Sequence, residues 1–214
     1  MSFAILNRCR GYGVKKLVLL AAAAPRFTQT PDFPYGMTQD AVDQMIEQIQ
    51  TDRAQFSEDF SRKLLYSPHS EAIKDWFCDL SLSASSIGTI ATGYALRDED
   101  GCADLYSVHV PTGIFHGKQD QIVPFELGEL QNQRIAGSQL FAFENSGHGI
   151  FYDELERFNQ CFLQIPKKVK RNIKTGRSIL VLFYNTNLHC IARYVSLYII
   201  NKQKRSVSQQ GQGD

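Results

Sequence analysis

The sequence predicts an α/β fold built on a parallel sheet, and three apolar segments carry that prediction. Residues 17–24 form an apolar run without polar alternation, which is typical of a strand buried on both faces of a parallel sheet. Residues 110–116 and 139–144 are two further strand-like runs, and each is followed by a polar, glycine-containing loop. We therefore expect three parallel strands with flanking helices.

Residues 25–109 lie between the first and second predicted strands and have a different pattern. Three prolines within residues 25–36 exclude a regular helix there. After Thr38 the apolar residues recur at helical spacing in three stripes, and a less regular fourth helix is expected over residues 83–96. One interpretation of these stripes is purely structural: a helical layer that only packs on the sheet. The stripes consist of Ala41, Val42, Met45, Ile46 and Ile49; then Phe56, Phe60 and Leu64; then Ile73, Trp76, Phe77 and Leu80.

Residues 110–166 alternate strands with helices and complete the predicted core. The strand at 110–116 is followed by a helix near residues 126–136, and the strand at 139–144 by a closing helix over residues 151–163. We expect this closing helix to pack through one side, which carries Leu155, Phe158 and Phe162.

The ends of the second and third strands carry residue types that acid–base chemistry needs. Residues 116–124 read His-Gly-x-x-Asp-x-x-x-Pro, and residues 146–149 read Ser-Gly-His-Gly. A carboxylate at Asp120 could hold the imidazole of His148 in one tautomer and steady its positive charge. The glycines beside His148 would give its loop the flexibility to turn the ring inward. Taken singly, Asp120 could instead be a turn former and His148 a surface histidine.

Taken together and in this order, the two motifs resemble those of the α/β-hydrolase fold family. The sequence around these motifs is most similar to that of small serine esterases and non-haem haloperoxidase-like enzymes. The resemblance covers about residues 1–165. It implies that Asp120 is the triad acid and His148 the triad base. It also implies a partial α/β-hydrolase, the C-terminal portion only, in which residues 1–24 are a remnant of the nucleophile helix and its following strand.

In such a fold, residues 25–109 would form a helical cap over the site and shape the pocket for an acyl or alcohol group. Within the third stripe, Trp76 and Phe77 are our candidates for substrate-binding residues. Residues 110–166 would form the C-terminal core that carries the acid and the histidine. The resemblance thus predicts a carboxylic-ester hydrolase whose substrate is a small ester-like molecule.

The nucleophile of this family is absent from the sequence. It belongs in a Gly-x-Ser-x-Gly motif, and none occurs in the 214 residues. We expect the serine to lie immediately upstream of Met1, and the chain to be inactive by itself. With three strands only, the first strand would expose an apolar edge where the nucleophile strand should pair, so we also expect poor solubility.

Residues 167–214 match nothing in the family. They hold ten Lys or Arg residues against one acid, whereas residues 1–166 are mildly acidic and the net charge is +1. We expect an unrelated or disordered basic tail. An arm for nucleic acid or anionic lipid, and a membrane span, are weaker interpretations, because His189 and Arg193 interrupt the apolar run.

The remaining composition argues against several other classes of protein. Five scattered cysteines without C-x-x-C spacing, and no secretory signal, predict free thiols and a cytoplasmic location. We expect no metal and no cofactor, no nucleic-acid or membrane partner, and leave the oligomeric state open. The alternative functions are a non-catalytic binding module that reuses the cap pocket, or a truncated or frameshifted product with a basic interaction tail.

Overall fold

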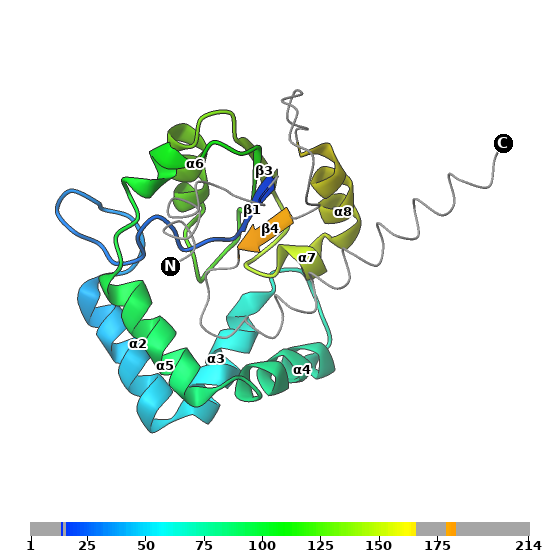
Figure 1. Cartoon of the computed structure of the whole chain (residues 1–214). Coiled ribbons are helices and arrows are strands. Elements are labelled where there is room, and N and C mark those ends of the chain that lie inside the picture. The colour runs from blue at the N-terminus through cyan, green and yellow to red at the C-terminus, as the bar shows by residue number, and fades with distance from the viewer. Residues whose placement is uncertain (1–13, 15, 166–178, 183–214) are drawn as a thin grey trace.

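The computed structural model describes residue 14, residues 16–165 and the strand residues 179–182 (Figure 1). The remnant of the nucleophile helix, expected in residues 1–24 before the first strand, and most of the basic tail lie outside the described residues. In chain order the elements are β1 (Lys16–Leu20), α2 (Gln39–Thr51), α3 (Arg53–Leu64), α4 (Glu71–Leu82), α5 (Ser86–Asp98), the 3-10 helix η1 (Asp104–Ser107), β2 (Thr112–Gly117), α6 (Phe125–Arg134), β3 (Gln139–Phe143), α7 (Ile150–Asp153), α8 (Leu155–Gln164) and β4 (Ile179–Leu182).

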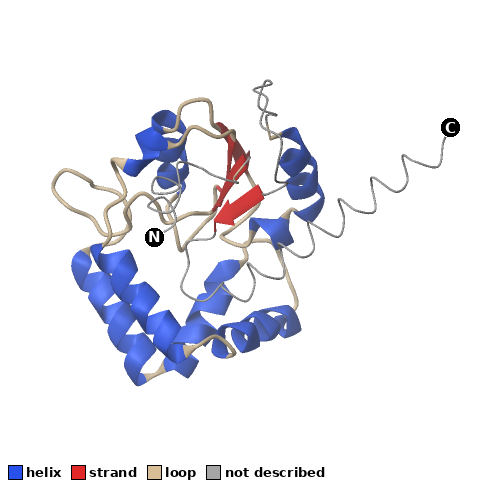
Figure 2. Ribbon diagram, viewed as in Figure 1, coloured by secondary structure: helices blue, strands red, loops and turns tan. Residues whose placement is uncertain are grey.

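The strands form one parallel sheet in the order β3-β2-β1-β4, and helices surround it (Figure 2). The three predicted strands are all present, with Leu17 opposite Thr112 and Ile114 opposite Leu140. β1 ends at Leu20, four residues earlier than predicted. The chain leaves the strand because Ala21 adopts a φ of 43°, in the left-handed region that extended strands do not use.

The fourth strand corrects two predictions. β4 pairs in parallel with β1, from Lys16 opposite Ile179 to Leu19 opposite Leu182. β1 is therefore an interior strand, and the exposed edge from which we expected poor solubility is not present. A segment of the tail that we expected to be unrelated or disordered instead meets the backbone groups on that side of β1, which would otherwise need other hydrogen-bond partners.

The two faces of the sheet are covered by different helices. Residues of β2 alternate between the faces, as a pleated strand requires. Phe115 lies on one face, where its ring stacks on Phe141 at 4.7 Å and meets Phe158 of α8 at 5.4 Å. His116 faces the other side, against Gly128 of α6. The polar residues after β2 and β3 therefore emerge between two packed layers.

The four helices α2 to α5 gather on one side of the molecule, away from α6 and α8 (Figure 1). α2 packs on α5, and α3 packs on α4. The first two apolar stripes are largely buried as predicted, whereas the third is only partly so because Trp76 is 38% exposed. The buried members of these stripes are Val42, Ile46, Ile49, Phe56, Phe60, Leu64 and Phe77.

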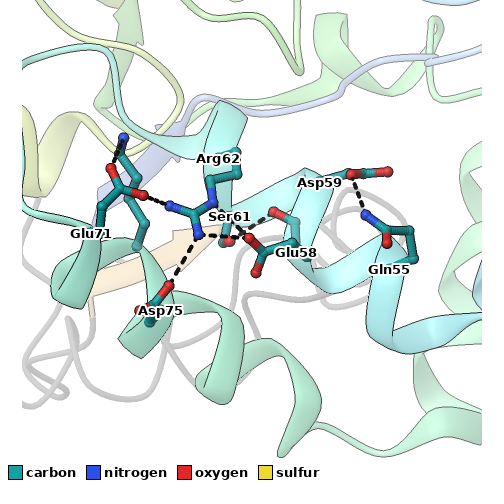
Figure 3. Close-up of polar contacts among 8 residues, drawn as sticks. Gln55, Glu58, Asp59, Ser61, Arg62, Glu71 and Asp75 are labelled. Carbon is teal, nitrogen blue, oxygen red and sulfur yellow. Dashed lines mark hydrogen bonds and ion pairs between the residues drawn. The ribbon is translucent and has the colours of Figure 1, made fainter.

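An exposed ion-pair network joins α3 to α4 (Figure 3). The guanidinium of Arg62 lies 2.7 Å from an oxygen of Glu58 on its own helix. It also contacts Glu71 and lies 3.2 Å from Asp75, both on α4. One cation thus connects three carboxylates on two helices.

The predicted closing helix is two helices, because α7 ends at Asp153 and α8 begins at Leu155. Phe158 and Phe162 are buried as predicted, but Leu155 is 40% exposed because it lies at the new start of α8 rather than along its packed side. Across the described part of the chain, every helix is too short or too polar to cross a membrane.

Candidate active site

The Asp120 side chain is held by the turn that follows β2. Its Oδ1 atom accepts hydrogen bonds from the backbone N–H groups of Ile122, at 2.8 Å, and Val123, at 2.9 Å. An aspartate that caps its own turn in this way is common in loops. Here it leaves the other oxygen, Oδ2, directed toward the end of β3. The turn-former interpretation is therefore correct for one oxygen only.

His148 meets that second oxygen. Its Nδ1 lies 2.8 Å from Asp120 Oδ2, and the two side chains are 2% and 0% exposed. Since an ionised carboxylate only accepts hydrogen bonds, Nδ1 carries the proton and donates it. The ring nitrogen Nε2 is then the basic nitrogen of a neutral imidazole. The structure thus brings together the two residues that the sequence motifs singled out.

The contact between Asp120 and His148 changes the pKa of the carboxyl group. Burial by itself raises the pKa of Asp120, but the charge of a protonated His148 and the hydrogen bonds from His116 and His148 outweigh it and leave that pKa well below its ordinary value. Asp120 is therefore ionised at neutral pH. A buried carboxylate of this kind stabilises the positive charge that an imidazole acquires when it takes up a proton.

His116 supports the same carboxylate from within the core. It is fully buried, with Nε2 at 3.0 Å from the carbonyl oxygen of Val123 and 3.4 Å from Asp120 Oδ2. Both neighbours are acceptors, so Nε2 carries the proton. Gly128 makes room for the ring, since a Cβ there would lie 2.8 Å from His116 Nδ1. From sequence, His116 stood out only as the first residue of the His-Gly-x-x-Asp motif, and no role was predicted for it.

The glycines around His148 are explained by close packing, not by the flexibility that we inferred from sequence. Gly149 donates its N–H to the carbonyl of Leu64 at 2.8 Å, and a Cβ at Gly149 would lie 2.5 Å from a methyl carbon of Leu65. A Cβ at Gly147 would approach the same segment to 3.0 Å. The His148 loop is therefore pressed against the end of α3.

The candidate substrate-binding residues lie in a different aromatic group. Phe77 is buried and meets the ring of Tyr152 edge-on at 5.4 Å, while Trp76 lies 6.5 Å from Tyr152. An aromatic residue of another helix contacts the imidazole: the ring of Phe60, on α3, lies 6.4 Å from that of His148 in an edge-to-face arrangement. In the sequence Phe60 belongs to the second apolar stripe, and nothing in that stripe distinguishes it from its neighbours.

A surface pocket borders the Asp120 turn. It is lined by apolar residues together with charged ones from the turn and the start of α6. Among the described residues there is no group of three or more His, Cys, Asp or Glu side chains placed to hold a metal ion. The pocket residues are Met37, Lys118, Asp120, Gln121, Ile122, Pro124, Phe125 and Glu126.

Curated proteins with similar sequences include an α/β-hydrolase superfamily protein and a non-haem chloroperoxidase. The chain is 44% identical over 159 residues to an α/β-hydrolase superfamily protein of Bacillus subtilis, a match that spans 74% of this chain and 59% of that protein. It is 28% identical over 163 residues to a non-haem chloroperoxidase of Kitasatospora aureofaciens, spanning 72% and 59%. No family model matches the sequence.

Solved structures give the same result. An esterase from Exiguobacterium antarcticum superposes with a TM-score of 0.70 at 45% identity, covering 75% of this chain and 61% of the esterase. A bromoperoxidase from Bacillus anthracis superposes with a TM-score of 0.69 at 25% identity, covering 75% and 62%. The chain therefore spans about three fifths of the length of these relatives. The predicted family is confirmed: this is a partial α/β-hydrolase fold, with hydrolase homologues over about three quarters of the chain.

Proposed function

We propose that this chain, a partial α/β-hydrolase, supplies the acid and the base of a serine hydrolase that cleaves small carboxylic esters. The observation that carries the proposal is the 2.8 Å contact between His148 Nδ1 and a buried oxygen of Asp120. The esterases among its homologues support ester bonds as the class of substrate.

In this proposal each member of the pair has one task. Asp120 fixes the tautomer of His148, so that Nε2 can take the proton from a serine hydroxyl as its oxygen attacks the ester carbon. The imidazolium then returns that proton to the departing alcohol. A water molecule repeats the sequence on the acyl-enzyme and releases the acid. His116 acts through Asp120, because its Nε2 lies 3.4 Å from the carboxylate oxygen Oδ2.

The helices of residues 25–109 are proposed to be the cap. The contact between Phe60, on α3, and the His148 ring supports this proposal, because one edge of the helical group lies next to the imidazole. We propose that the substrate enters beside this edge, and that Trp76 and Phe77 line the apolar part of its route. Residues 110–166 are the core that presents the acid and the base.

The serine itself is proposed to come from outside these 214 residues, since the sequence contains no Gly-x-Ser-x-Gly motif. The chain by itself should then show no turnover of p-nitrophenyl esters. The test is to join to it the part of the Exiguobacterium esterase that it does not match, and to measure ester hydrolysis and labelling by a fluorophosphonate probe.

The fused protein should hydrolyse the ester and take up the probe. Both properties should disappear in the His148→Ala variant and persist in His109→Ala, a matched control at an exposed histidine. Equal activity in the His148→Ala variant, or hydrolysis by the unfused chain that depends on His148, would refute the proposal.

A non-catalytic binding module is the second candidate, and the missing serine motif favours it. Such a module would bind esters or their acid products without turnover, even in the fused protein. Binding of a non-hydrolysable ester analogue that is weakened by Trp76→Ala, together with an inactive fusion, would select this function.

A further inference from the structure

A second buried carboxylate, Asp153, lies five residues after His148 at the end of α7. Its side chain is 0% exposed. Each of its oxygens accepts two hydrogen bonds: Oδ2 from the N–H groups of Gly147 and Tyr66, at 2.8 and 2.9 Å, and Oδ1 from the N–H of Ser67 and from His69 Nε2, at 3.2 and 2.8 Å. The catalytic scheme above does not use it.

The four donors come from two segments that are far apart in sequence. Gly147 belongs to the loop that presents His148, whereas the other three belong to the connection between α3 and α4. Two more hydrogen bonds join the same segments: Gly149 N–H to Leu64 O, and Ser67 Oγ to Asn145 O, both at 2.8 Å. Asp153 is thus the carboxylate at which the His148 loop and the helical group are tied together.

The buried carboxylate of Asp153 needs hydrogen-bond donors for both of its oxygens. A carboxylate withdrawn from water must have its oxygens satisfied by hydrogen bonds, and here both are. Two of its donors are backbone N–H groups of adjacent residues, Tyr66 and Ser67, so this segment has little freedom to shift. The bond to Gly147 N–H then fixes the residue directly before His148.

We propose that Asp153 is a positioning residue that holds the His148 ring against Asp120 by anchoring the His148 loop to the α3–α4 connection. The description of His148 as a base rests on the proposed function. The positioning role does not require catalysis, because it concerns only how firmly Asp120 holds the Nδ1 proton of His148.

The test uses the full chain and follows the low-field NMR signal of the His148 Nδ1 proton, identified by its loss in Asp120→Asn. In Asp153→Asn, an amide nitrogen replaces one acceptor oxygen and faces two donors. The signal should exchange with water at least about tenfold faster, because losing charge-assisted hydrogen bonds raises the population of locally open states. Asp100→Asn is the control, since Asp100 also accepts a backbone N–H, from Cys102 at 2.8 Å, in another loop.

Unchanged exchange of the His148 proton in a folded Asp153→Asn protein would overturn the proposal. If that variant fails to fold, His69→Ala decides, because it removes one of the four donors at a position that is 17% exposed. It should speed the exchange by a smaller factor, and no change would overturn the proposal. Ester hydrolysis by the fused protein is a separate measurement. An inactive fusion, together with faster exchange of the His148 proton in Asp153→Asn, would reject the proposed function and keep the positioning role.

Discussion

The ends of β2 and β3 and the α3–α4 helix pair both use carboxylates, but in opposite surroundings. Asp120 is 0% exposed and every partner is fixed by the backbone or by another buried ring. The carboxylates around Arg62 are 38–67% exposed and belong to side chains at the surface. Because water screens exposed charges, the interior site should control chemistry and stability, whereas the exposed network should adjust stability only slightly.

The largest difference is expected from replacing one aspartate in each region by asparagine. Asp120→Asn leaves buried donors facing an amide and should cost about 3 kcal/mol of unfolding free energy, since breaking a buried pair on one side costs about 3–5 kcal/mol. Asp75→Asn should cost about 0–1 kcal/mol, as for exposed ion pairs. Urea denaturation of both variants measures these two losses of unfolding free energy. Equal losses would contradict the contrast between the two regions. In an active fused protein, Asp120→Asn should lower kcat by about 10⁴.

A glycine in each region sharpens the comparison, because alanine should act in opposite directions. A Cβ at Gly117, at the end of β2, would lie 2.1 Å from the carbonyl oxygen of Gly147, whereas one at Gly88 of α5 meets nothing closer than 3.5 Å. Gly117→Ala should therefore destabilise by about 2–3 kcal/mol through overpacking. Gly88→Ala should stabilise by about 0.5–1 kcal/mol, because alanine is the better helix former. Thermal unfolding of the two variants tests the signs.

The interior pair should also give stability a dependence on pH that its Asn variant lacks. The folded state lowers the pKa of Asp120 below its unfolded value of about 4. Its contribution is thus complete above about pH 4 and is lost as the pH falls toward the folded value, by about 1.4 kcal/mol per pH unit. The stability gap between the parent chain and Asp120→Asn should shrink between pH 4 and pH 3. A constant gap over that range would contradict the lowered pKa.

The sequence predicted those parts of the molecule that short-range patterns encode. Motif order and strand ends identified Asp120 and His148, because the carboxyl ends of parallel strands meet at one edge of the sheet. The roles of Phe60 and Asp153 depend on contacts with segments about 85 residues apart in sequence, and no local pattern specifies such a contact. Nor could residue patterns show that residues 179–182, in a basic tail, pair with β1.

The smallest effect should come from the exposed network itself. Arg62→Ala removes contacts to Glu58, Glu71 and Asp75 at once, but its side chain is 36% exposed, so screening limits the loss. We expect a loss of at most about 1 kcal/mol, falling further when salt is added, because the Debye length shortens from about 10 Å at 0.1 M to about 3 Å at 1 M. Lys63→Ala, one residue along on the same helix, is the control for removing a positive charge. A larger, salt-independent loss for Arg62→Ala would mean that the network is as well insulated from solvent as the Asp120 site, and the contrast between the two regions would fail.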